Sequence, residues 1–216
     1  MTHQRINLST YQPINSSIHQ KVKKIYSDHF PDAFIGEAGN CEVAYARLHE
    51  RKWDLVVLDI NLPGRSGLEL IHDIKAFNEE IPVLILSMYN EDQMALRAIK
   101  AGALGYLYKA RASDELVRAS ELILGGKLYL SVHATGMLAK EYRQEKNGDL
   151  LKQLSDREYF VLLRLAQGET IAGISGSLSL SAKTISTYKS RIMRKLGLKS
   201  MVQLIQLVQE NGLLNT

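Results

Sequence analysis

The chain of 216 residues has one cysteine, Cys41, so no disulfide can form within it, which suits a reducing cytoplasm. No apolar run reaches about 18 residues and the amino terminus has no apolar signal core, so we expect neither a membrane span nor a secretory signal. The six histidines lack the spacing of metal ligands, and no Ser-His-Asp or Cys-His set can be proposed. Catalysis, a resident metal and a cofactor are therefore not expected.

One segment of the carboxyl-terminal part contains basic residues but no acidic ones. From Lys183 to Lys199 there are six basic residues and no acidic one. Residues 1–130 contain 15 Lys and Arg against 16 Asp and Glu, whereas residues 131–216 contain 12 against 7. Lys and Arg that neutralise phosphates release counterions from DNA, so any contact with double-stranded DNA is expected in the carboxyl-terminal part.

Residues 1–130 alternate short apolar runs with amphipathic stretches. The strand-like runs are Ile6–Ser9, Ala33–Ala38, Leu55–Asp59, Val83–Ser87 and Gly105–Tyr108. The helical patterns lie near residues 15–27, 41–52, 67–78, 92–101 and 113–124. Five alternations of strand and helix predict an α/β fold, a doubly wound five-stranded parallel sheet covered on both faces.

Three polar residues stand at, or just past, the ends of predicted strands. They are Asp59, Ser87 and Lys109. In doubly wound sheets, sites form beyond the carboxyl ends of the strands. A carboxylate placed there can attack a phosphorus atom, and a cation and a hydroxyl beside it can stabilise the transferred charge. The sequence therefore predicts a phosphate pocket at this edge.

The pattern changes after residue 130. Residues 131–150 are interpreted as a linker, partly helical, with a turn signal at Asn147-Gly148. Residues 151–216 then predict an all-α unit of four helices. The first begins at a capping box, Ser155 with Glu158, and a basic helix begins at Ser181.

The basic helix has two distinct faces. Ile185, Ile192, Met193 and Leu196 fall at helical spacing, which indicates a face against the core. Lys183, Ser186, Thr187, Ser190 and Arg194 share the opposite face and are the candidates for base edges of the major groove, with Lys183 the best candidate for a guanine. Thr184, Tyr188, Arg191 and Lys195 are candidates for backbone phosphates, and Lys189 adds to the basic surface.

These motifs resemble a known family. The segment with the LSxRE opening and KTISTYKSRIMRKL is similar to the LuxR/NarL-type helix-turn-helix. The runs LVVLDINLPGRSGLELI, VLILSMYNE and AIKAGALGYLYK resemble a response-regulator receiver domain. The pair resembles the NarL/FixJ family of two-component response regulators. That resemblance implies that Asp59 accepts a phosphoryl group, that Ser87 and Lys109 hold it, and that Tyr106 is a switch residue.

One part of the family pattern is replaced. The family carries two adjacent acids after the first strand, which hold Mg²⁺; here those positions are Thr10 and Tyr11, aligned on Pro13. No acid precedes Asp28 to rescue the site. We therefore expect poor Mg²⁺ binding and an atypical receiver, in which phosphorylation of Asp59 is inefficient.

The interpretation is a cytoplasmic, DNA-binding transcriptional regulator acting as a homodimer, with a sensor kinase or another regulatory protein as further partner and no membrane contact. Two alternatives stay open. One is a conventional regulator activated by phosphorylation. The other is a protein-interaction module that acts through a partner regulator.

Overall fold

The computed structural model describes residues 5–9, 16–60, 66–88, 92–143, 150–211 and 213. The chain divides into two compact units, Met1–Ala139 and Lys140–Thr216, which are described separately below. No helix in these ranges combines the length and the apolar character needed to cross a membrane.

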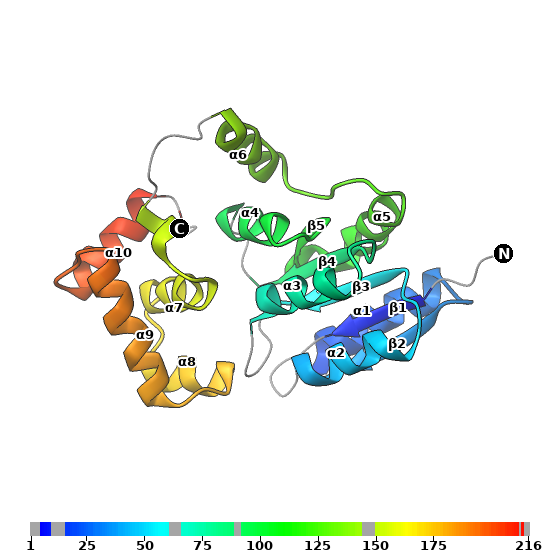
Figure 1. The fold of residues 1–216 in the computed structure, drawn as a ribbon, viewed down its shortest axis with the longest axis horizontal. Coiled ribbons are helices and arrows are strands. Elements are labelled where there is room, and N and C mark those ends of the chain that lie inside the picture. Colours follow the sequence, from blue (N-terminus) through cyan, green and yellow to red (C-terminus); the bar gives the residue numbers. More distant parts are fainter. Residues whose placement is uncertain are drawn as a thin grey trace. The chain divides into compact units, whose positions relative to one another are not determined.

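The first unit is built on a parallel sheet of five strands in the order β2-β1-β3-β4-β5 (Figure 1). The strands are β1 (Arg5–Ser9), β2 (Phe34–Ala38), β3 (Leu55–Asp59), β4 (Val83–Ser87) and β5 (Gly105–Tyr108). Every residue of β3 and β4 is buried, as the continuous apolar runs of two central strands require. The predicted fold class and its strands are confirmed.

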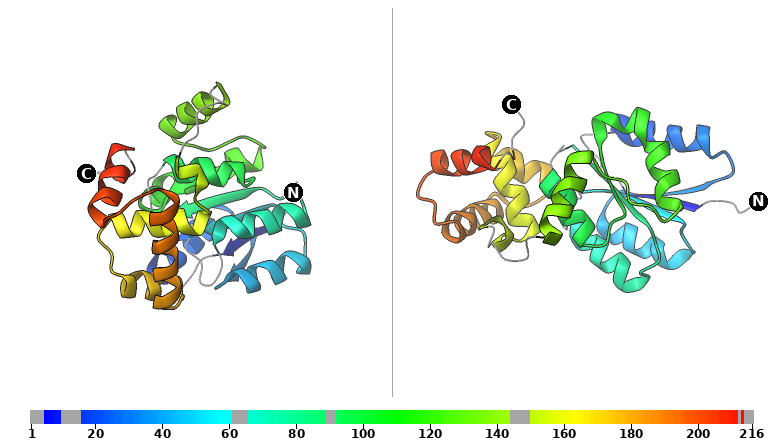
Figure 2. Two further views of the ribbon diagram at one scale, coloured as in Figure 1. Left: turned by 60° about the vertical axis from the view of Figure 1, so that its left-hand side comes forward. Right: turned by 90° about the horizontal axis from the view of Figure 1, so that it is seen from above.

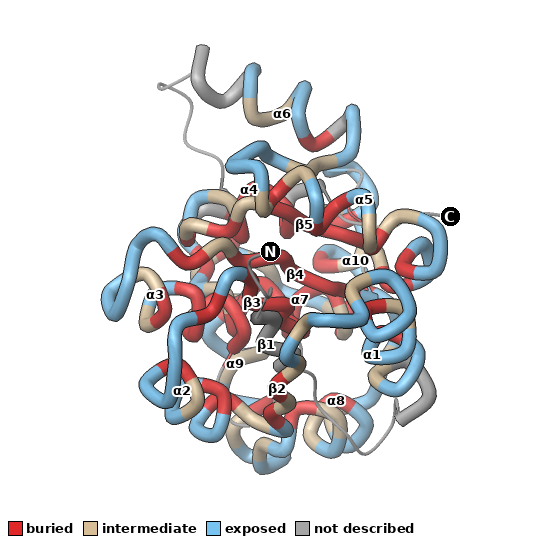
Figure 3. Tube along the Cα trace, turned by 90° about the vertical axis from the view of Figure 1, so that its right-hand side faces the viewer, coloured by how far each residue is buried: buried red, intermediate tan, exposed pale blue. Residues whose placement is uncertain are grey.

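Five helices cover the sheet. They are α1 (Ser16–His29), α2 (Cys41–Glu50), α3 (Gly67–Phe77), α4 (Asp92–Lys100) and α5 (Ala112–Leu124). Helices α1 and α5 lie together on one face and α2 and α3 on the other (Figure 2). The core between the sheet and α1 and α5 includes Tyr26, Leu84 and Leu116. Figure 3 shows the buried central strands β3 and β4 among helices that have exposed outer faces.

The chain that leaves α5 pairs with the sheet before it turns into a further helix. The Tyr129 nitrogen donates to the Leu104 carbonyl at 2.9 Å, and the Tyr106 nitrogen donates to the Tyr129 carbonyl at 3.0 Å. The Tyr129 hydroxyl donates to Glu115 of α5 at 2.6 Å. Helix α6 (Val132–Arg143) follows, within the stretch expected to be a linker.

The second unit is helical. It contains a short 3-10 turn, η2 (Leu150–Gln153), and the helices α7 (Asp156–Ala166), α8 (Ile171–Leu178), α9 (Ala182–Lys195) and α10 (Met201–Glu210). The predicted capping box is present, because the Ser155 nitrogen donates to the Glu158 carboxylate at 2.8 Å and the Glu158 nitrogen donates to the Ser155 hydroxyl at 3.3 Å. Apolar side chains from all four helices form the core, including Leu162, Ile174, Ile185 and Leu204.

Candidate phosphate pocket and nucleic-acid interface

Three predicted site residues meet at one edge of the sheet. In the parallel register Asp59 lies opposite Leu86, and Ser87 lies opposite Tyr108, so the ends of β3, β4 and β5 are level. Asp59, Ser87 and Lys109 are only 3%, 0% and 6% exposed. Polar groups buried to this degree need partners, because unpaired burial is unfavourable.

Lys109 supplies such a partner to Asp59. Its ammonium donates a hydrogen bond to the Asp59 carboxylate, and the two side chains form a buried ion pair. The lysine begins the 3-10 turn η1 (Lys109–Arg111) directly after the end of β5. The pair is thus formed in the unmodified protein.

Tyr106 lies two strands away from β3, on β5, and is 7% exposed. Its backbone nitrogen holds the segment that leads to α6, as described above. The predicted metal-acid positions Thr10 and Tyr11, and the loop of residues 61–65, lie outside the described residues.

Mg²⁺ prefers one or two carboxylates together with water and phosphate oxygens. Asp59 contributes one carboxylate, and Lys109 already neutralises it. Ser87 contributes a hydroxyl, and the sequence provides Thr10 and Tyr11 where acids would stand. Within the described ranges, no three His, Cys, Asp or Glu side chains form a group that could hold a metal.

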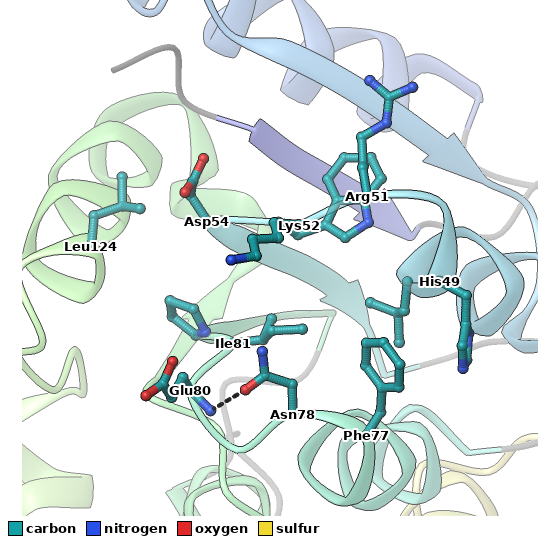
Figure 4. Close-up of a pocket in the computed structure, with 12 residues that line it drawn as sticks. His49, Arg51, Lys52, Asp54, Phe77, Asn78, Glu80, Ile81 and Leu124 are labelled. Carbon is teal, nitrogen blue, oxygen red and sulfur yellow. Dashed lines mark hydrogen bonds between the residues drawn. The ribbon is translucent and has the colours of Figure 1, made fainter. Parts of the chain in front are cut away.

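A separate hollow of about 760 Å³ lies at the opposite edge of the sheet (Figure 4). Its lining includes Asp54 and Pro82, which precede β3 and β4, whereas Asp59 and Ser87 end these strands. The centroids of the His49 and Phe77 rings, which lie at its side, are 4.3 Å apart. The hollow is therefore not part of the phosphate pocket.

Helix α9 is the predicted basic helix. The Ser181 hydroxyl caps it by accepting from the Thr184 nitrogen at 3.0 Å. Ile185 and Ile192 are fully buried against the unit, so the opposite face points outward. That face exposes most of the candidate DNA contacts, namely Lys183, Ser186, Thr187, Ser190, Arg191 and Arg194, whereas Thr184, Tyr188 and Lys189 are half-buried.

The small hydroxyl residues of this face bond to their own helix. Thr187 donates to the Lys183 carbonyl at 2.9 Å, and Ser190 donates to the Ser186 carbonyl at 3.0 Å. Their protons are thereby engaged, and their oxygens are left with accepting capacity. Charged side chains therefore dominate what this face can offer a nucleic acid.

Lys195 differs from the other basic residues of α9. Its ammonium donates to the Glu158 carboxylate at 2.5 Å and to the Gln153 carbonyl at 3.0 Å. Lys195, for which a phosphate contact is predicted, thus makes two contacts within the helical unit. Sequence reasoning identified Glu158 as part of a cap but missed this second role, because a contact over 37 positions leaves no local pattern.

Burial alone would raise the pKa of the Glu158 carboxyl. Hydrogen bonds from Lys195 and Ser155 outweigh this effect, and the pKa lies below its ordinary value. Glu158 is therefore a charged, buried carboxylate at neutral pH.

Comparison with known proteins matches both units. Residues 17–121 match the response regulator receiver domain, and residues 152–208 match the bacterial regulatory proteins of the luxR family. A receiver followed by this DNA-binding unit defines a response regulator. The chain belongs to the LuxR-type response regulators, which are DNA-binding transcriptional regulators.

Individual relatives agree with this assignment. A putative transcriptional regulator of Pseudomonas aeruginosa is 38% identical over 182 residues, which cover 83% of this chain and 86% of the relative. Response regulator UvrY of Escherichia coli is 30% identical over 195 residues, covering 90% and 89%. The crystal structure of a LuxR-family two-component response regulator from Aurantimonas is 30% identical, with a TM-score of 0.57 over 66% of this chain and 100% of that chain.

Proposed function

We propose that α9 docks in the major groove of duplex DNA and that Lys183, Ser186, Thr187, Ser190 and Arg194 face the base edges. The observation that carries this proposal is the exposed basic face of α9, on the side opposite the fully buried Ile185 and Ile192. Thr184, Tyr188, Lys189 and Arg191 flank that face and are assigned to backbone phosphates. The protein would act in the cytoplasm as a homodimer on paired half-sites, because a two-fold reader matches a two-fold site.

Salt dependence tests this interface. Affinity for a labelled duplex should fall steeply with ionic strength. Lys183→Ala with Lys189→Ala should weaken binding, because one base contact and one phosphate contact are lost, and the lost phosphate contact should lower the slope of log affinity against log salt by about 0.9. A matched control removes two exposed lysines of α1 instead, Lys21→Ala with Lys24→Ala. If both double variants weaken binding equally, general charge and not α9 governs the affinity.

We further infer that the protein is controlled without efficient Mg²⁺-dependent phosphorylation of Asp59. The support is the donor set, in which Asp59 is already paired with Lys109 and Thr10 and Tyr11 replace two acids. The proposal assigns no metal to the unphosphorylated receiver. A sensor kinase or another regulatory protein that binds the receiver would then act through contact with this unit.

Mass spectrometry of the full chain tests the second proposal. The chain is incubated with a small phosphodonor, with Mg²⁺ or with a chelator, beside an Asp59→Asn variant. We expect little labelling, and none that depends on the metal. Rapid Mg²⁺-dependent addition of one phosphoryl group, absent in Asp59→Asn, would establish the conventional phosphorylated regulator instead.

A further inference from the structure

A single buried carboxylate joins the first and third helices of the DNA-binding unit. Glu158 lies in the first turn of α7, and Lys195 is the last residue of α9. The side chain of Glu158 is 4% exposed and that of Lys195 is 34% exposed. One ammonium thus contacts two places, the Glu158 carboxylate and the Gln153 carbonyl of η2.

This contact fixes one end of the basic helix. The carboxylate is itself held by the Ser155 nitrogen, so the cap of α7 and the end of α9 share one acceptor. The apolar residues Ile185 and Ile192 hold α9 against the unit along its length. The apolar contacts of these residues are non-directional, whereas a hydrogen-bonded ion pair defines the position of the helix end. Gly197, at φ +67, ends α9 just beyond this point.

We propose that Lys195 is a positioning residue of the DNA interface, which uses its charge to fix the end of α9 on α7 and η2 and does not neutralise a DNA phosphate. The proposal rests on the proposed function, in which α9 enters the groove. Arg191 of the same helix is exposed and is assigned to a backbone phosphate. Two cations of α9 therefore have different tasks.

The salt dependence of binding separates these tasks. The full chain and its variants are titrated against a duplex selected by the wild-type chain from a random-sequence library. Each lost phosphate contact lowers the slope of log affinity against log salt by about 0.9. Arg191→Met removes an exposed residue that is assigned to a backbone phosphate, so it should show that loss and keep wild-type thermal stability. Lys195→Met should keep the wild-type slope, weaken binding about tenfold at every salt concentration, and lower the melting temperature measured by helical circular dichroism.

Two further variants control for folding. Lys195→Arg keeps the charge and should restore most of the affinity and stability. The pair Glu158→Gln with Lys195→Met removes both charges, so it should be more stable than Lys195→Met alone, because no buried carboxylate is left unpaired. The proposal is overturned if Lys195→Met lowers the salt slope as Arg191→Met does, or if it leaves affinity unchanged.

The outcome is distinguishable from failure of the proposed function. If the wild-type chain binds no duplex, the proposed DNA interface is wrong for this chain, and the positioning role is overturned with it. The melting temperatures then report only the ion pair. If the wild type binds and Lys195→Met behaves like Arg191→Met, only the positioning role is wrong.

Discussion

Removing one partner of the buried pair between Asp59 and Lys109 should destabilise the receiver unit strongly. Both side chains are nearly inaccessible, at 4% and 3% exposed. Breaking a buried pair from one side typically costs about 3–5 kcal/mol, because the remaining charge keeps its desolvation penalty and loses its partner. Asp59→Asn and Lys109→Met should each show a loss of this size.

The only tryptophan of the chain provides the assay. Trp53 lies in the receiver unit and is 4% exposed, so its fluorescence reports the unfolding of this unit within the full chain. With a urea m-value of about 2 kcal/mol/M, a loss of about 4 kcal/mol moves the midpoint down by about 2 M.

A double variant isolates the interaction. Asp59→Asn with Lys109→Met leaves no buried charge at this place, so its midpoint should lie above that of either single variant. Losses that simply add in the double variant, or an Asp59→Asn midpoint equal to the wild type, would refute the reasoning that the pair is coupled and buried.

Three further results are expected. Gly36→Ala should cost about 1–3 kcal/mol, because its new methyl group would lie 2.3 Å from the Trp53 ring, whereas Gly39→Ala, with open space, should not; urea unfolding compares them. Ser155→Ala should lower the thermal stability of the second unit by about 1 kcal/mol, since a capping hydroxyl is lost. Burial, with Glu115, raises the pKa of Tyr129 to about 12, so its stabilising contribution is complete below pH 10 and is lost as pH rises toward 12. Burial also raises the pKa of Tyr26, so the tyrosinate absorbance of Tyr129→Phe should show one late-titrating group fewer than the wild type, and not the loss of all of them.

Local patterns predicted much of the fold. The apolar run of β3 and its terminal Asp59 were readable because a central parallel strand has no polar positions until it ends. The start of α7 was readable because Ser155 and Glu158 form a cap within four residues. Both features depend only on neighbours in the chain.

Contacts between distant segments could not be predicted in the same way. Tyr129 is one residue of an irregular segment, and nothing periodic marks its pairing with β5. The sequence predicts a phosphate contact for Lys195, but composition does not reveal that a buried carboxylate 37 positions earlier accepts a hydrogen bond from its ammonium. Helical periodicity places a side chain on a face, but only tertiary packing decides its partner.

One measurement tests the central claim most directly. The affinity of the full chain for duplex DNA is measured across a salt series, before and after treatment with Mg²⁺ and a small phosphodonor. Steep salt dependence that the treatment leaves unchanged is the predicted result. The claim would be contradicted if binding appeared only after the treatment and if a folded Asp59→Asn variant did not bind.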